Sequence, residues 1–391
     1  MKRIMFIISI MFFVNNISAQ SLMDLYKKGT VKLIPDETYA QHNDWDKVFE
    51  TYYDTLYNRP MGDRKSIVLM PNGSVVVNHA YKNYYSLFDS NGKFVKEFGV
   101  TNHSGKQLKK TNAIQGIIGN HFFTGLDNMG KMLCFDFTGK YIKTLTLDYM
   151  AHDMIPLPDN KIAVVGWVIW KDGFRDLISI VDYNTNKEKI VWDHFSKSIR
   201  SNHRPNIAFV KNRLIATFPS SGDIFIYDVK GNLLSKDKAN WKRSYISVEE
   251  QKESQRKEIE ELKKRGNLEK YEGRVFVNGE KVTKNIIEIM NENLNKITEP
   301  LPLPLFLAII KDTDDNLLFF EAPKENGANK FNVWVYDNGG KFVGQCSFEC
   351  DQYDLSITPS KMIFHNGYIY SLQKLKNTTG NPLRLVRFKP I

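Results

Sequence analysis

The stretch Ile224-Phe-Ile-Tyr-Asp-Val-Lys-Gly-Asn-Leu-Leu234 decides the fold, because its pattern returns along the chain. An alternating apolar strand ends in Tyr227-Asp228, and a tight Lys230-Gly231 turn leads into a second strand. Further copies each place an aspartate at the end of the first strand: Asp89, Asp136, Asp182 and Asp337. An aspartate there bonds the local backbone of the turn, so we interpret this series as structural rather than catalytic.

The spacing of these aspartates gives the repeat. Asp89, Asp136, Asp182 and Asp228 follow one another at intervals of 47, 46 and 46 residues, whereas Asp337 follows after 109. A period in the mid-forties whose unit is strand and turn is typical of propeller blades. Helical repeats of similar length would show apolar spacings of three and four, which these segments lack.

A shorter hairpin precedes the aspartate hairpin, and its turn is rich in Asn, Gly and Asp. Asn and Gly tolerate the positive φ that two-residue hairpins require. The six inner turns are Pro71-Asn-Gly73, Gly119-Asn120, Pro158-Asp-Asn160, Lys211-Asn212, Asp314-Asp-Asn316 and His365-Asn-Gly367. The sequence therefore predicts an all-β, six-bladed β-propeller over residues 20–391.

The last blade is one strand short. Beyond its inner hairpin only Leu383–Phe388 remains before the chain stops at Ile391. The isolated strand Val31–Ile34 near the amino terminus would supply the missing outer strand and leave no open sheet edge. We expect this N-terminal strand to close the last blade.

The long interval before Asp337 predicts an insertion. Residues 243–303 form a small α-helical insertion within the propeller, between its fourth and fifth blades. Ser247 and Glu250 make a capping box at the start of a charged helix. Thr283 is expected to cap a second helix.

Residues 1–19 read as a signal peptide. Lys2-Arg3 precedes an apolar run, and Ile17-Ser-Ala19 is a cleavage signal before Gln20. The run is too short to span a membrane as a stable helix, so no transmembrane segment is expected in the mature chain. We expect a chain secreted across the inner membrane, monomeric and periplasmic or extracellular.

Cysteine and metal signals are weak. Three cysteines make no disulfide framework. Cys346 and Cys350 would lie roughly 13 Å apart in a continuous strand, so a bridge requires a chain reversal between them. No Cys or His pair has zinc spacing, and we expect no metal and no cofactor.

The hairpin pattern and the Ser-Ala-Gln ending of the signal resemble the secreted six-bladed β-propeller proteins related to NHL-repeat and TolB-like propellers. The resemblance covers residues 31–391 apart from the insertion. Such families include binding modules, lactonases and lyases, so the resemblance implies the fold and no single activity.

Propeller topology predicts where a site lies. Hairpin turns occupy one face, and the loops from second to third strands and between blades occupy the other, which is the usual ligand face by analogy with the architecture. Aromatic and basic side chains that suit stacking on sugars and pairing with carboxylates or sulfates fall in those loops. The predicted ligand-binding residues are His79, Lys82, Trp167, Trp170, Arg175, His203 and Arg204.

His152 and Asp153 are the candidate catalytic pair. In one interpretation the pair supplies a general base at the mouth of the central channel. In the other, the two residues are simply the solvated start of the third blade. Neighbours in a regular strand point to opposite sides, so the two are not expected to form a dyad with each other.

Two functions remain open. The first is a secreted binding module for a glycan, peptide or partner protein, with anionic glycan or an envelope protein as partner and no nucleic acid. The alternative is an enzyme of lactonase, lyase or glycosidase type at the channel mouth. The sialidase box, the Gly-x-Ser-x-Gly elbow and an EF-hand-like loop are all absent from the sequence.

Overall fold

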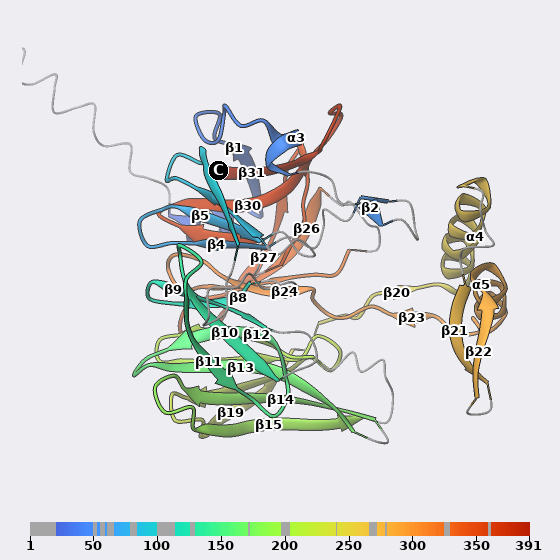
Figure 1. Ribbon diagram of the computed structural model, residues 1–391, viewed down its shortest axis with the longest axis horizontal. Helices are drawn as coiled ribbons and strands as arrows, with labels where there is room; N and C mark the ends of the chain where they lie inside the picture. Colours follow the sequence, from blue (N-terminus) through green and yellow to red (C-terminus); the bar gives the residue numbers. More distant parts are fainter. Residues whose placement is uncertain are drawn as a thin grey trace, which may run out of the picture.

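The chain folds mainly into successive antiparallel sheets (Figure 1). A computed structural model describes residues 21–49, 53–54, 59–60, 66–78, 84–99, 114–125, 130–170, 173–196, 204–239, 241–265, 272–277, 280–323, 329–358 and 361–391. The signal-peptide prediction lies outside these residues.

Four sheets contain four strands each, paired in chain order. They comprise β4 (Ser66–Leu69), β5 (Val75–Asn78), β6 (Tyr84–Phe88) and β7 (Phe94–Gly99); β8 (Ile114–Ile118), β9 (His121–Gly125), β10 (Lys131–Asp136) and β11 (Tyr141–Thr146); β12 (Met150–Leu157), β13 (Lys161–Trp170), β14 (Gly173–Asp182) and β15 (Glu188–Ser196); and β16 (Asn206–Val210), β17 (Arg213–Thr217), β18 (Asp223–Asp228) and β19 (Leu233–Lys238). The first strands β4, β8, β12 and β16 contact one another in this order, so they form the inner wall of the assembly.

The remaining large sheet has nine strands. They are β24 (Ala308–Lys311), β25 (Leu317–Phe320), β26 (Lys330–Tyr336), β27 (Phe342–Glu349), β1 (Thr30–Pro35), β31 (Leu383–Pro390), β30 (Tyr368–Leu375), β28 (Tyr353–Asp354) and β29 (Met362–His365). The first half of β1 pairs with β27 in parallel, and its second half pairs with β31 in antiparallel fashion. β1 therefore joins two four-stranded units into one sheet.

Both kinds of predicted turn are confirmed. Every inner turn contains a residue with positive φ, such as Gly73 at 82° and Asn212 at 61°. In the outer turns the aspartate accepts backbone N–H bonds, as Asp228 does from Lys230 and Asn232, both at 2.8 Å. The aspartates of this series thus act as local turn caps.

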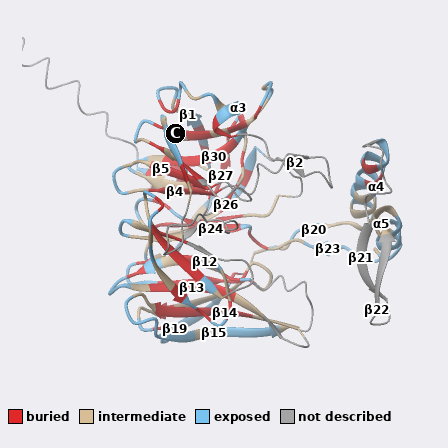
Figure 2. Ribbon diagram, in the orientation of Figure 1, coloured by how far each residue is buried: buried red, intermediate tan, exposed pale blue. Residues whose placement is uncertain are grey.

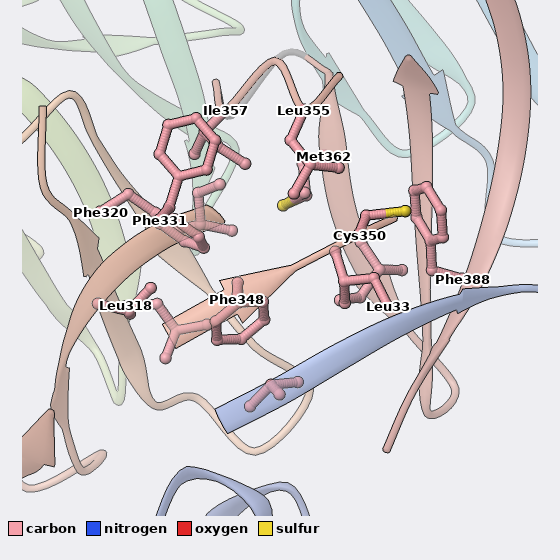
Figure 3. Close-up of a cluster of buried hydrophobic side chains, with 14 of the residues drawn as sticks. Leu33, Leu318, Phe320, Phe331, Phe348, Cys350, Leu355, Ile357, Met362 and Phe388 are labelled. Atoms are coloured by element: carbon pink, nitrogen blue, oxygen red, sulfur yellow. The ribbon is translucent and has the colours of Figure 1, made fainter. Parts of the chain in front are cut away.

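The core lies between neighbouring sheets. Most buried apolar side chains of the described residues fall into six clusters. Five clusters lie between two neighbouring sheets, the sixth lies between the two halves of the nine-stranded sheet, and the cluster of Val75 and Leu385 joins the first sheet to the last. Figure 2 shows this buried layer, and Figure 3 shows Leu318, Phe348 and Leu33 pointing into one cluster from three strands. Because neighbouring sheets cover both faces of the inner strands, successive residues are buried on alternate faces. This explains the near-continuous apolar runs of these strands.

The amino-terminal region packs on the sheets. Helix α2 (Leu22–Lys27) buries Leu22, Leu25 and Tyr26, and the Tyr26 hydroxyl donates to Asp312 at 2.8 Å. Helix α3 (Trp45–Val48) begins at the N-cap Asp44. A short hairpin of β2 (Tyr53–Asp54) and β3 (Arg59–Pro60) follows.

Residues 243–303 depart from the sheets. A two-stranded ladder of β20 (Tyr245–Ile246) and β23 (Leu301–Pro302) leads to helix α4 (Val248–Arg265), hairpin β21 (Glu272–Val277) and β22 (Glu280–Asn285), and helix α5 (Ile286–Asn295). In Figure 1 the α4 and α5 helices lie apart from the sheets, joined to them by this ladder.

The structure can be compared with the predicted caps of the two inserted helices and with the expectation for Cys346 and Cys350. The capping box is confirmed, because Ser247 Oγ accepts from the Glu250 N–H and Glu250 accepts from the Ser247 N–H. The prediction of Thr283 as the second cap is wrong: Thr283 lies in β22 and Asn285 is the N-cap of α5. Cys346 and Cys350 are both buried free thiols.

Candidate functional site

The β12–β15 sheet carries most of the described candidate residues. Its hairpin turn at 158–160 lies at one end, so Met150 at the start of β12 and Trp170 at the end of β13 lie at the opposite end. His152 and Asp153 near the start of β12, Trp167 near the end of β13, and Arg204 before β16 all lie towards that end.

A β-bulge changes the geometry of His152 and Asp153. Ala151 pairs with Gly166 and Asp153 pairs with Val165, which leaves His152 as the extra residue. Ala151 and Met154 both pack on the cluster shared with the preceding sheet, so His152 and Asp153 both fall on the other side of the strand. The expectation that the two residues point to opposite sides is therefore wrong.

The same side of the sheet carries an aromatic and basic surface. The Arg204 guanidinium lies over the Trp167 indole, 5.6 Å from the ring centroid. Trp167 contacts the ring of Phe174 at 5.7 Å and pairs in register with Asp176, whose side chain is buried. We call the surface of His152, Asp153, Trp167 and Arg204 the Trp167 surface.

The electrostatics of the pair follow from its surroundings. Desolvation lowers the pKa of His152, the positive charge of Arg204 lowers it further, and Asp176 opposes both. Desolvation also raises the pKa of Asp153 to about 7, although the Met154 N–H donates to its carboxylate at 2.8 Å. His152 itself is solvent-exposed.

Both pKa shifts favour the uncharged forms of the adjacent His152 imidazole and Asp153 carboxyl group. Such a pair can accept and donate a proton at physiological pH. The Trp167 indole and the Arg204 guanidinium beside it can stack on a ring and pair with an anion.

Arg175 lies elsewhere. It precedes Asp176 in β14 and points to the opposite face of the sheet, where its Nε donates to Asp193 at 2.8 Å and its Nη2 lies 2.5 Å from the same oxygen. The structure therefore separates Arg175 from Trp167 and Arg204.

The other candidates cannot be placed. His79, Lys82 and His203 lie outside the described residues. Trp170 ends β13, and its side chain is not described.

In the described ranges no group of three or more His, Cys, Asp or Glu side chains is arranged to hold a metal ion. No helix of the same ranges is long and apolar enough to cross a membrane.

Sequence reasoning missed Asp176 and His194, which are paired in register on the face of the Trp167 surface. The signal was present in Asp176, because a carboxylate interrupts an otherwise apolar strand at a position that alternation predicts to be buried.

No family model and no curated protein matches the chain. Among solved structures, a member of the duf4221 family from Bacteroides vulgatus has 13% identity and a TM-score of 0.56, over 93% of this chain and 99% of that one. The calcium-binding protein regucalcin from Agrobacterium tumefaciens has 9% identity and a TM-score of 0.42, over 83% and 88% of the two chains. Virginiamycin B lyase from Staphylococcus aureus has 15% identity and a TM-score of 0.40, over 83% and 94%.

The match to the duf4221 protein shows a shared fold and no shared activity. The sheets pack face to face, and their first strands contact one another in order. The match to the duf4221 protein agrees with this arrangement, so this chain is a β-propeller.

Proposed function

We propose that this β-propeller binds an anionic glycan on the Trp167 surface. The proposal is carried by one observation, the Arg204 guanidinium that lies 5.6 Å from the Trp167 ring centroid on the face that holds His152. An indole stacks on the apolar face of a sugar ring, and a guanidinium beside it pairs with a carboxylate or sulfate on that ring.

Charge supports an anionic ligand. The chain has 54 Lys and Arg residues against 44 Asp and Glu, a formal net charge of +10. A positive protein raises the local concentration of anions and speeds their association. The lowered pKa of His152 favours its neutral form, which can both donate and accept a hydrogen bond.

We also propose that the ring has six blades and that β1 closes it. Three observations support this: the six buried clusters, the pairing of Leu33 with Pro390, and the contact of β30 with β4. Residues 243–303 would then be a separate folding unit between the fourth and fifth blades, since their strands pair with one another and not with the large sheets.

The proposed location is outside the inner membrane, in the periplasm or beyond, for a monomer related to NHL-repeat and TolB-like propellers. The basic start, apolar run and small residues of positions 1–19 support export. An anionic envelope glycan is a ligand available in that location.

A second candidate function is catalysis at the same surface. The observation that favours it is the bulge that turns His152 and Asp153 to one side, with the pKa of Asp153 raised to about 7. A lactonase, lyase or glycosidase step needs such a proton donor and acceptor.

The test is a screen of anionic and neutral glycans with the wild type, Trp167→Ala and Arg204→Ala. The exposed Arg256→Ala on α4 serves as the control. Binding of anionic glycans that both site variants weaken by about tenfold and the control leaves unchanged supports the proposal. Unchanged binding in both site variants contradicts it.

Lactone, ester and glycoside substrates are assayed alongside. Turnover that His152→Ala and Asp153→Asn both abolish would replace the binding function with the enzymatic one.

A further inference from the structure

A groove lies on the opposite face of the β12–β15 sheet from the Trp167 surface. Its volume is about 700 Å³, and Val168, Leu177 and Ile190 form its apolar wall. Asp148 and Tyr149, in the connection between β11 and β12, form its other side. The groove is thus walled by one sheet and by the chain that enters it.

The charges of the groove are unlike those of the whole chain. Asp148 and Glu188 both line it, and Arg175 is its only basic lining residue in the described part of the chain. Arg175 is already paired with Asp193, at 2.5 Å. The groove is therefore net negative in a protein with an excess of Lys and Arg.

The negative charge of Asp148 acts on Glu188. Desolvation raises the pKa of Glu188, the negative charge of Asp148 raises it further, and a hydrogen bond from Ser179 opposes both. The Ser179 hydroxyl also bonds to the Tyr149 hydroxyl. A cation placed between these carboxylates would relieve their repulsion.

The groove is elongated along the strands. Glu188 pairs with Val181, and Arg175 lies six residues before Val181 on β14. At about 3.3 Å per residue, the Glu188 end and the Arg175 end are about 20 Å apart. The exposed side chain of Ile190 lies along this length, on the outermost strand of the sheet.

We propose that the groove binds an organic cation, an ammonium or guanidinium group on an aliphatic stem. The charged group lies between Asp148 and Glu188, and the stem lies over Ile190. A lysine side chain of an extended peptide and a free polyamine share this chemistry. The site is separate from the Trp167 surface and does not depend on the function proposed for it.

Two probes distinguish the sources. One is a short labelled peptide with a central lysine, compared by fluorescence anisotropy with the same peptide carrying norleucine. The other is spermidine, added as a competitor and titrated alone by calorimetry. We expect the lysine peptide or spermidine to bind, with the lysine peptide about tenfold tighter than its norleucine partner if the peptide is the ligand.

The variants test the position. Glu188→Gln and Asp148→Asn should each weaken binding about fivefold, and Ile190→Ala about threefold through its lost stem contact. Glu249→Gln on α4 should leave it unchanged. Asp148 and Ile190 are exposed, so at least these two variants are expected to fold.

The outcomes separate cleanly. Tighter binding of the lysine peptide than of its norleucine partner supports a lysine side chain as the ligand, and binding of spermidine with equal affinity for the two peptides supports a free polyamine. Absence of spermidine binding together with equal affinity for the two peptides, or binding unaffected by Asp148→Asn, overturns the proposal.

Discussion

Replacing Asp153 by asparagine should stabilise the protein at alkaline pH. The pKa of Asp153 in the folded chain is raised by desolvation from 3.8 to about 7. A carboxyl group with a raised folded pKa resists ionisation in the native state, so it destabilises the fold increasingly as the pH rises from 4 towards 7. Asparagine removes that penalty and still accepts the Met154 N–H bond.

The size of the effect follows from the pKa. A difference of about 3 pH units at about 1.4 kcal/mol each sets an upper limit of about 4 kcal/mol. Asp153 is half-buried and water reaches it, so we expect about 2 kcal/mol for Asp153→Asn at pH 8 and almost none at pH 4.

The assay is urea unfolding of wild type and Asp153→Asn at pH 4 and pH 8. Asp351→Asn, at an exposed position, is the matched control and should change stability at neither pH. If Asp153→Asn is equally stable to the wild type at pH 8, or less stable, Asp153 is not the desolvated carboxyl described above.

Three further predictions concern the fold. Gly166→Ala should cost about 2–3 kcal/mol in urea unfolding, because its Cβ would lie 2.1 Å from the Tyr149 ring, whereas Gly344→Ala has open space and should be neutral; equal stability of the two contradicts the packing. Deleting residues 20–36 should lower stability by at least about 4 kcal/mol and cause aggregation, because two fully buried β1 side chains are lost and the edges of the neighbouring strands are exposed. A monomer with unchanged melting would refute β1 as a closing strand. Excising residues 245–298 with a short linker should leave a folded propeller by circular dichroism, and failure to fold would make the insertion part of the core.

The turns could be predicted because their chemistry is local. A positive φ at Gly73 or Asn212, and the backbone bonds of Asp228, depend on a few consecutive residues and are visible in any copy of the repeat. Repetition then supplied the architecture, since a strand-and-turn unit of fixed period packs on its neighbours in only a few ways.

The site could be predicted only in part. The region of Trp167 and Arg204 followed from topology, but the bulge at His152 is set by the register of β12 against β13, which no local pattern specifies. The face of the sheet on which Arg175 lies depends in the same way on the residue at which the β13–β14 hairpin turns. The parallel pairing of β1 with β27 joins residues some 317 positions apart, such as Thr30 and Ser347, and has no sequence signal.

The most direct test of the central claim compares one ligand in two charge states. Affinities for an oligogalacturonate and for its methyl ester are measured by calorimetry with the wild type and Arg204→Ala. The wild type should prefer the free acid by about tenfold, and Arg204→Ala should lose that preference while still binding the ester through Trp167. A preference for the acid that survives in Arg204→Ala would contradict the Trp167 surface as the anionic glycan site.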